Sequence, residues 1–489
     1  MPALLILICA VFSGGAAGLH AERNRPPVIN VWVNDQQVPV IEHWVGGQLN
    51  CTYAPLTLPG SADVEVEVPG GVRHWTVSPQ KCEIPVTLEG GRLKFSMLTS
   101  KYMVVAVNGM RLLLLADPPE DGLPDEKKLL DVSAAPYNLD RSGAKDCTTV
   151  LQKACDDAGT LGNGAIVVLP PGLYTTTGIH LRSRTQLYLA PGAVLQANDV
   201  PEAYDECPLS PGTTRTAALI RLDGVEHVRI FGRGTIDARG QALAGDPAAR
   251  EESRLLASCI EAQMSHCLSI DGVICKETTA VALNISESHD IAIRRIKVIN
   301  DLSSSDCVDG IRISASQRAL VEDCLVHTTE DAYAVTGGEA APTEQVVMRR
   351  LVAVTSARAL RCGPLAHNGM ERIRFEDVDI VQARDALVLM HGEGKGDWRD
   401  ITFRDIRVEN CGRNNLAIHL LGGGSIRDIR FEDVHFAQSR PGFLRGWNDD
   451  SRIQSITFAG LEIEGRPAQN AASAGLRVGD FVDDIRFDN

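Results

Sequence analysis

The chain has 489 residues, with 48 basic and 63 acidic side chains and a formal net charge of −15 at pH 7. This acidity argues against a nucleic-acid-binding protein, because phosphate recognition needs a basic surface. A hydrophobic content of 44% is typical of a folded protein. The length allows about two to four domains, or one large β architecture with a small partner.

Residues 1–21 are typical of a secretory signal peptide. An apolar run from Ala3 to Phe12 is followed by small residues, with a plausible cleavage point after Gly18 or Ala21. The alternative is an uncleaved anchor, although the apolar run is short for a membrane span. The segment predicts a secreted or periplasmic protein with no membrane span once the signal is removed.

Residues 28–118 are expected to form a first domain. Stretches such as "ADVEVEVPG" and "YMVVAVNGMRLLLLA" alternate or run apolar between Gly, Pro and Asn turns, which indicates a small β-sandwich. The Pro-rich, charged segment 117–128 is typical of a linker. A second domain is expected over 131–489.

The second domain opens with one predicted helix over 147–159 and continues as short strands. Segments such as "ALIRLDG", "SCIEAQM", "GIRISAS" and "ALVLMHG" are predicted to be equivalent first strands, each followed by a second and a third. Their expected central residues step by 23, 27, 27, 30 and 26 along the chain; these are Ile311, Ala334, Arg361, Val388, Ile418 and Leu444. This period favours a β-solenoid, whereas a β-propeller needs four strands and a period of about forty.

Three carboxylates fall one period apart. Asp309, in "SSDCVDGIRI", precedes Glu330 and Asp331, in "HTTEDAYAV", by 21 and 22 residues. Residues one coil apart in a solenoid lie about 4.8 Å from each other, so the three acids should share one patch. Like charges this close raise at least one carboxyl pKa, and a carboxyl that stays protonated can act as an acid.

No cofactor or metal is expected. The chain has thirteen cysteines, one of them in the leader, and none shows CxxC or metal-ligand spacing. Most are interpreted as small buried hydrophobes rather than disulfides. These scattered residues are Cys259, Cys267, Cys275, Cys307, Cys324, Cys362 and Cys411.

Two further stretches carry a family resemblance. "NGAIVVLPPGLYTTTGIHLRSRTQLYLAPGAVLQAND" and "VRIFGRGTIDARGQAL", the latter with G-x-G-x-I-D ending at Asp237, resemble the opening coils of the polygalacturonase family of glycoside hydrolases. The resemblance covers roughly 130–440. It implies a right-handed parallel β-helix and inverting hydrolysis of glycosidic bonds. The dextranase and isopullulanase family, of the same clan, also has a β-sandwich before its β-helix.

The resemblance also implies residue roles. By position Glu330 is the expected general acid, while Asp309 and Asp331 are expected to hold and deprotonate the attacking water. In inverting enzymes the acid and base lie about 6.5–9.5 Å apart, which leaves room for that water.

The sequence departs from the family pattern at several positions. Glu330 and Arg312 each replace Asp, the family's G-H-G falls on Ala357-Arg358-Ala359, and its R-I-K falls on Val388-Leu389-Met390. Because R-I-K holds the galacturonate carboxylate in the family, standard polygalacturonan is not the expected substrate. Six side chains are expected to contact a polysaccharide or oligosaccharide instead: Arg312, Arg358, Arg361, His391, His419 and Trp447.

Two other functions stay open. A non-catalytic glycan-binding protein is possible, because a solenoid offers a long groove without any chemistry. A β-helix lyase or epimerase is possible because Arg312 and Arg358 lie near the acids, although that chemistry usually needs Ca²⁺ and an acidic sugar. The sugar, the linkage, endo or exo action and the oligomeric state do not follow from the sequence.

Overall fold

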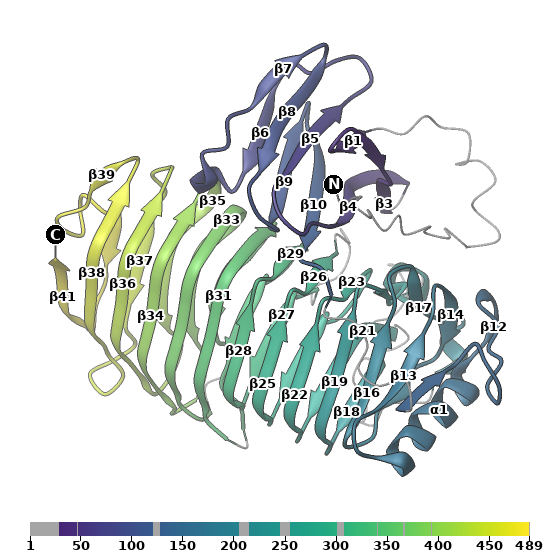
Figure 1. Ribbon diagram of the computed structural model, residues 1–489. Coiled ribbons are helices and arrows are strands. Elements are labelled where there is room, and N and C mark those ends of the chain that lie inside the picture. The colour runs from purple at the N-terminus through teal and green to yellow at the C-terminus, as the bar shows by residue number, and fades with distance from the viewer. Residues whose placement is uncertain are drawn as a thin grey trace. The chain divides into compact units, whose positions relative to one another are not determined.

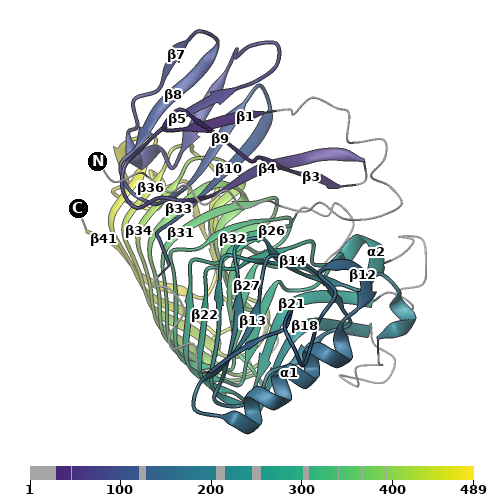
Figure 2. The ribbon, with the colours of Figure 1, turned by 45° about the vertical axis from the view of Figure 1, so that its right-hand side comes forward.

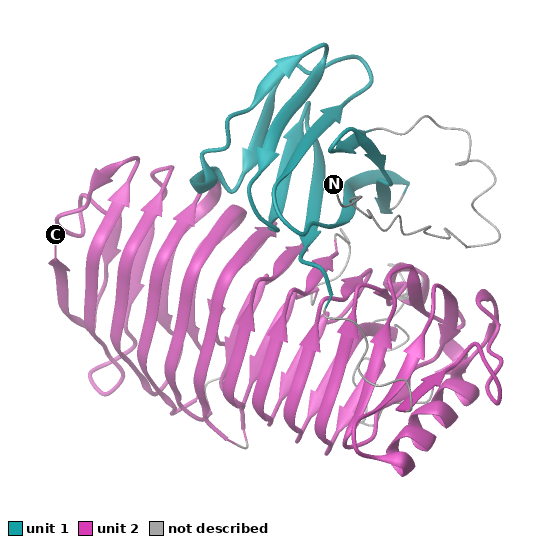
Figure 3. Ribbon diagram, viewed as in Figure 1, with its two compact units in different colours: residues 1–126 teal, residues 127–489 magenta. Residues whose placement is uncertain are grey.

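The structure is a computed structural model that describes residues 29–45, 47–120, 128–204, 215–244, 255–300, 308–339, 341–364, 367–392 and 394–488. It divides into two compact units, residues 1–126 and 127–489 (Figure 3). The expected signal peptide, 1–21, lies outside the described residues. Within the described ranges, no helix is long and apolar enough to cross a bilayer.

The first unit is a β-sandwich, as predicted. Its two five-stranded sheets share one core, in which alternate residues such as Val64 and Val66 meet Leu112 and Leu114. The first sheet has the order β2 (Gln36–Val38), β1 (Asn30–Val33), β5 (Ala62–Glu67), β8 (Arg92–Met97), β7 (Thr87–Glu89). The second has the order β3 (Ile41–Val45), β4 (Gln48–Thr57), β10 (Met110–Asp117), β9 (Tyr102–Val107), β6 (Trp75–Ser78).

The second unit is a parallel β-helix of three-strand coils (Figure 1), which confirms the predicted fold class. Each strand pairs with its counterpart in the next coil, so the unit consists of three parallel stacks. The first stack begins with β15 (Ile179–His180), which was not among the predicted first strands. The predicted first strands follow it in the stack: β18 (Arg215–Asp223), β21 (Leu255–Gln263), β24 (Leu283–Ser286), β27 (Ile311–Ser314), β30 (Tyr333–Thr336), β32 (Arg358–Cys362), the end of β33 (Met370–His391), β35 (Cys411–Leu420), β37 (Gly442–Arg445) and β40 (Leu476–Val478).

The other two stacks follow in each coil. The second contains β11 (Leu129–Asp131), β13 (Ala165–Leu169), β16 (Thr185–Leu189), β19 (Glu226–Gly232), β22 (His266–Asp271), β25 (His289–Arg294), β28 (Gln317–Glu322) and β41 (Val482–Asp488). The third contains β12 (Ser142–Asp146), β14 (Gly172–Thr176), β17 (Ala193–Ala197), β20 (Thr235–Asp237), β23 (Ile274–Lys276), β26 (Lys297–Ile299) and β29 (Leu325–Thr328). Longer strands serve later coils: β31 (Thr343–Thr355), β33, β34 (Asp397–Val408), β36 (Ser425–Phe436) and β38 (Ile453–Ile463), with β39 (Arg466–Pro467) antiparallel to β38.

The predicted helix is α1 (Thr148–Leu161), which lies across the amino-terminal end of the solenoid (Figure 2). It buries Leu151, Ala154, Cys155 and Ala158 in the solenoid core. A terminal coil of a solenoid has no neighbour on one side, so this helix covers apolar surface that stacking leaves open. The sequence did not predict the short helix α2 (Gly240–Ala244) or the 3₁₀ turns at Gln80–Cys82 and Pro201–Ala203.

An aromatic ladder runs through the core of the later coils. Phe375, Phe403, Phe431, Phe458 and Phe487 stack in sequence, with ring centroids 4.8 to 5.1 Å apart. Each ring comes from the same position of successive coils, so one residue type fills the same space repeatedly. Packing between coils therefore fixes the register of these strands.

That register corrects the predicted central residues. Ile311 pairs with Tyr333, and Ala334 instead pairs with Arg312 and Arg361 in an outward-facing column. Tyr333 is buried, and its hydroxyl can donate to either of two carbonyls, those of Cys324 (3.0 Å) and Val352 (3.1 Å). Of the predicted central residues, Ile311 and Ile418 therefore lie on the inward face, whereas Ala334, Arg361 and Val388 lie on the outward face, one residue out of register.

Candidate active site

Asp309 and Asp331 lie side by side immediately before β27 and β30 of the first stack. The amide of Asp331 donates to Oδ1 of Asp309 (3.1 Å), and the amide of Gly310 donates to the carbonyl of Asp331 (2.8 Å). A Cβ on Gly310 would lie 2.4 Å from Val326 and 2.5 Å from the carbonyl of Ala332. Glycine is therefore required at position 310 for the two coils to stack this closely, and the close stacking brings the carboxylates of Asp309 and Asp331 together.

Three arginines neutralise the three acids. Arg312 forms an ion pair with Asp309, and Arg361 forms one with Oδ2 of Asp331. Arg358 bridges two carboxylates: its Nε pairs with Oδ1 of Asp331, and its Nη2 lies 3.3 Å from Glu330. Both oxygens of Asp331 are thus occupied by guanidinium groups.

The three carboxylates differ in their access to solvent. The side chain of Asp331 is 0% exposed and that of Asp309 is 4% exposed, whereas that of Glu330 is 27% exposed. Burial raises the pKa of Glu330; the Arg358 charge opposes this rise, and the charges of Asp331 and Asp309 add to it. Burial also raises the pKa of Asp309, against the influence of Arg312. Glu330 is therefore the accessible carboxyl of the three, and its pKa lies above the ordinary value of a glutamate.

Sequence reasoning missed a fourth buried carboxylate, Asp385. It pairs in register with Arg358 and accepts hydrogen bonds from Arg413 (2.8 and 2.6 Å) and Asn414 (2.6 Å). Burial alone would raise its pKa, but these bonds and one from Arg384 lower it. The acidic patch therefore continues as a charged column along the first stack, and "ARDAL" carries no pattern that would have revealed it.

The expectation that His391 contacts a substrate is wrong. His391 is 0% exposed, its ring nitrogens lie 3.0 and 2.6 Å from the carbonyls of Gly392 and Gly396, and its ring packs on Trp398. It holds the Gly-rich turn after β33 rather than facing solvent.

His419 and Trp447 lie further from the acids, on later coils of the first stack. His419, on β35, is half-buried with its ring edge-on to Phe443 at 5.5 Å, and burial lowers its pKa. Trp447, after β37, is half-exposed. Since coils are about 4.8 Å apart, β35 and β37 lie roughly 14 to 19 Å from the coil of Glu330. A contact with a sugar there stays a prediction.

The G-x-G-x-I-D motif is structural. Gly232 has φ +122°, and a Cβ there would lie 2.0 Å from the carbonyl of Leu189. Asp237 is buried, 2.9 Å from Nζ of Lys276, and this neighbour together with hydrogen bonds lowers its pKa against the effect of burial. The motif closes a turn and takes no part in the acidic patch.

Cys259, Cys275, Cys324, Cys362 and Cys411 form no disulfide and are buried, as the interpretation as small hydrophobes requires. Cys267 is partly exposed, and Cys307 lies outside the described residues. Within the ranges that the structure describes, no group of three or more His, Cys, Asp or Glu side chains is arranged to hold a metal ion.

Comparison with known proteins supports the resemblance. Residues 210–356, which include the three acids, match the family described as Glycosyl hydrolases family 28. A protein of Vitis vinifera named "Probable polygalacturonase" is 27% identical over 300 residues, which span 55% of this chain and 60% of that relative. The chain thus aligns with less than two thirds of the length of this relative.

Solved structures share the fold. The polygalacturonase of Erwinia carotovora matches with a TM-score of 0.59 at 16% identity, over 76% of this chain and 98% of its own. Dex49A of Penicillium minioluteum matches with a TM-score of 0.57 at 10% identity, over 94% of this chain and 93% of its own. The chain therefore resembles polygalacturonases in sequence and in its parallel β-helix.

Proposed function

We propose that this protein is a secreted glycoside hydrolase that cleaves a polysaccharide or oligosaccharide with inversion, and that Glu330 is its general acid. The proposal rests on the patch of three carboxylates on two adjacent coils, in which Glu330 is the member that is both accessible to solvent and raised in pKa. A carboxyl with a raised pKa keeps its proton to higher pH and can donate it to a leaving oxygen.

In the proposed reaction, Glu330 gives its proton to the glycosidic oxygen as the bond from that oxygen to the anomeric carbon breaks. A water attacks the anomeric carbon from the opposite face and loses a proton to Asp309. Asp331 supports this step from behind: its amide orients Asp309, and its carboxylate holds Arg358 and Arg361. Water contact by Asp331 itself requires that one arginine first move away.

The substrate is proposed to differ from standard polygalacturonan. The positions of the family's R-I-K are Val388, Leu389 and Met390, and Val388 and Leu389 are buried. Arg312, Arg358 and Arg361 each form an ion pair with at least one of the acids, and Arg312, whose side chain is 32% exposed, is the most accessible of the three to a substituent of the sugar.

A second candidate function is glycan binding without turnover. Both carboxylate oxygens of Asp331 and one of Asp309 form ion pairs with arginine. A nearby positive charge makes a carboxylate a weaker base for removing a proton from water, which favours binding without turnover.

Both candidates are tested by measuring reducing ends released from plant, algal and microbial glycans, neutral and acidic, beside the Glu330→Gln variant. Hydrolysis predicts release by the wild type and a loss of at least about a hundredfold in the variant, as expected for a lost general acid. Binding to a glycan with no release by either protein would replace the hydrolase with the binding protein. A rise in unsaturated-product absorbance that a chelator abolishes would indicate a lyase.

A further inference from the structure

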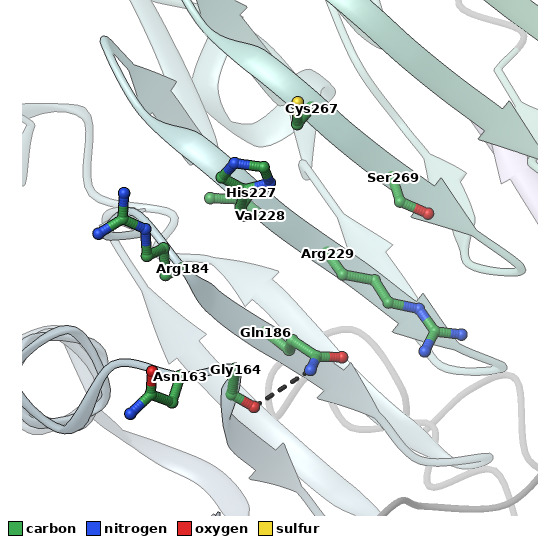
Figure 4. Close-up of a pocket in the computed structure, with 9 residues that line it drawn as sticks. All are labelled: Asn163, Gly164, Arg184, Gln186, His227, Val228, Arg229, Cys267 and Ser269. Carbon is green, nitrogen blue, oxygen red and sulfur yellow. Dashed lines mark hydrogen bonds between the residues drawn. The ribbon is translucent and has the colours of Figure 1, made fainter.

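A shallow groove of about 530 Å³ lies on the second stack, away from the acidic patch (Figure 4). It crosses the strands β16, β19 and β22, whereas the acids precede β27 and β30 of the first stack. Its lining includes Gly164, Arg184, Gln186, Arg229, Cys267 and Ser269. Nothing in the proposed hydrolysis uses these side chains.

The central cation of this groove is Arg229. Its guanidinium lies 3.9 Å above the ring of Phe231, which holds the side chain extended along β19. Figure 4 shows Arg229 between Gln186 on one neighbouring strand and Ser269 on the other, as their register requires. Among the described residues, no carboxylate lies within ion-pair distance of Arg229.

The carboxylates nearest to Arg229 in the sheet are already neutralised. Glu226 pairs with Arg184 and lies 3.1 Å from Nε2 of His266. Asp271, which pairs in register with Phe231, forms an ion pair with Arg295 and lies 3.9 Å from Arg233. The groove therefore has an excess of positive charge on a chain whose net charge is −15, and it favours an oxyanion.

A small ion bound to Arg229 would leave the side-chain oxygen of Gln186 without a hydrogen bond. Its Nε2 donates to the carbonyl of Gly164 (3.1 Å), which fixes the amide, and its Oε1 is buried without a hydrogen-bond partner. This oxygen is an acceptor and needs a hydrogen-bond donor, which a sulfate ion lacks and a sugar hydroxyl provides. A ligand that carries both an oxyanion and hydroxyl groups satisfies Arg229 and Gln186 together.

We propose that this groove is a second, non-catalytic binding site for an acidic glycan, in which Arg229 binds a carboxylate or sulfate group and Gln186 accepts a sugar hydroxyl. The open, shallow form suits a polymer that lies across the strands. The site holds the glycan at the side of the solenoid, independently of whether the acidic patch hydrolyses it.

Cys267 provides a local readout, because its thiol is free, partly exposed and part of the groove. The full-length protein is alkylated with and without a short oligogalacturonide, and the modification of each cysteine is followed by peptide mass spectrometry. Cys82, which is also free and partly exposed but lies in the other unit, is the internal control. The proposal predicts that the glycan slows modification of Cys267 several-fold and leaves Cys82 unchanged.

Two variants decide the role of Arg229. Arg229→Gln should raise the glycan concentration needed for half-maximal protection of Cys267 at least about tenfold, because the variant loses a charge-assisted hydrogen bond to the ligand. Arg374→Gln is the matched control, since Arg374 belongs to the same outward column but is exposed and outside the groove, and it should leave the protection intact. Equal protection in the Arg229→Gln protein, or none in the wild type with either oligogalacturonide or a sulfated oligosaccharide, would overturn the site. Equal protection by sodium sulfate alone would overturn the glycan as its ligand.

Discussion

Replacing Asp331 by Asn should destabilise the protein by about 3 kcal/mol. Asp331 is 0% exposed, and it pairs with Arg361, which is 9% exposed, and Arg358, which is 20% exposed. Removing one partner of a buried ion pair costs about 3–5 kcal/mol, because the other charge stays buried without compensation. The lower end applies because Arg358 keeps Glu330 as a partner, at 3.3 Å.

The measurement is urea unfolding followed by circular dichroism, with the midpoint and slope compared between variants. Glu330→Gln is the matched control: its side chain is 27% exposed and makes one long ion pair, so its unfolding free energy should stay within about 1 kcal/mol of the wild type. If Asp331→Asn proved as stable as Glu330→Gln, the conclusion that Asp331 is the buried anchor of two arginines would be refuted.

Three further predictions concern pH and packing. Because the Arg358 charge lowers the pKa of Glu330, Arg358→Gln should move the alkaline loss of activity to higher pH, as read from a pH–rate profile. Burial would raise the pKa of Glu322, but three arginines lower it to about 2 from an ordinary 4.5, so its contribution to stability is complete above pH 4.5 and lost as the pH falls toward 2. Thermal unfolding across that range should show a smaller loss for Glu322→Gln than for the wild type. Phe403→Ala, which removes a ring stacked on both sides, should cost about 3–5 kcal/mol in urea unfolding, and a cost below about 1 kcal/mol would contradict the role of the ladder.

The fold was readable from the sequence because each coil repeats its apolar pattern and turn residues. The register of the strands, that is, which residues face inward, could not be predicted. Outward positions such as Ala334, Val388 and Ala417 are apolar and almost fully buried, so alternation no longer separates the two faces. In addition, one residue per coil at the start of the second stack has positive φ without being Gly, as in Asp290 (57°) and Arg318 (52°). Arg has no preference for positive φ, so the sequence does not reveal where this backbone conformation occurs.

The proximity of the three acids could be predicted because it depends only on the period. The occupation of Asp331 by Arg358 and Arg361 could not, since it depends on side-chain direction across two coils. The same limit explains the wrong prediction for His391, which was expected to contact a substrate but whose ring turns into the Gly-rich loop that follows it.

Inverting hydrolysis by the acidic patch would be read from the anomeric configuration of the first product. Proton NMR would follow the first minutes of turnover on whichever glycan the wild type cleaves. With Glu330 as the general acid of an inverting enzyme, the new reducing end first appears in the configuration opposite to that of the cleaved bond, and Glu330→Gln forms no product on this timescale. Initial appearance of the retained anomer, or undiminished turnover by Glu330→Gln, would contradict this mechanism.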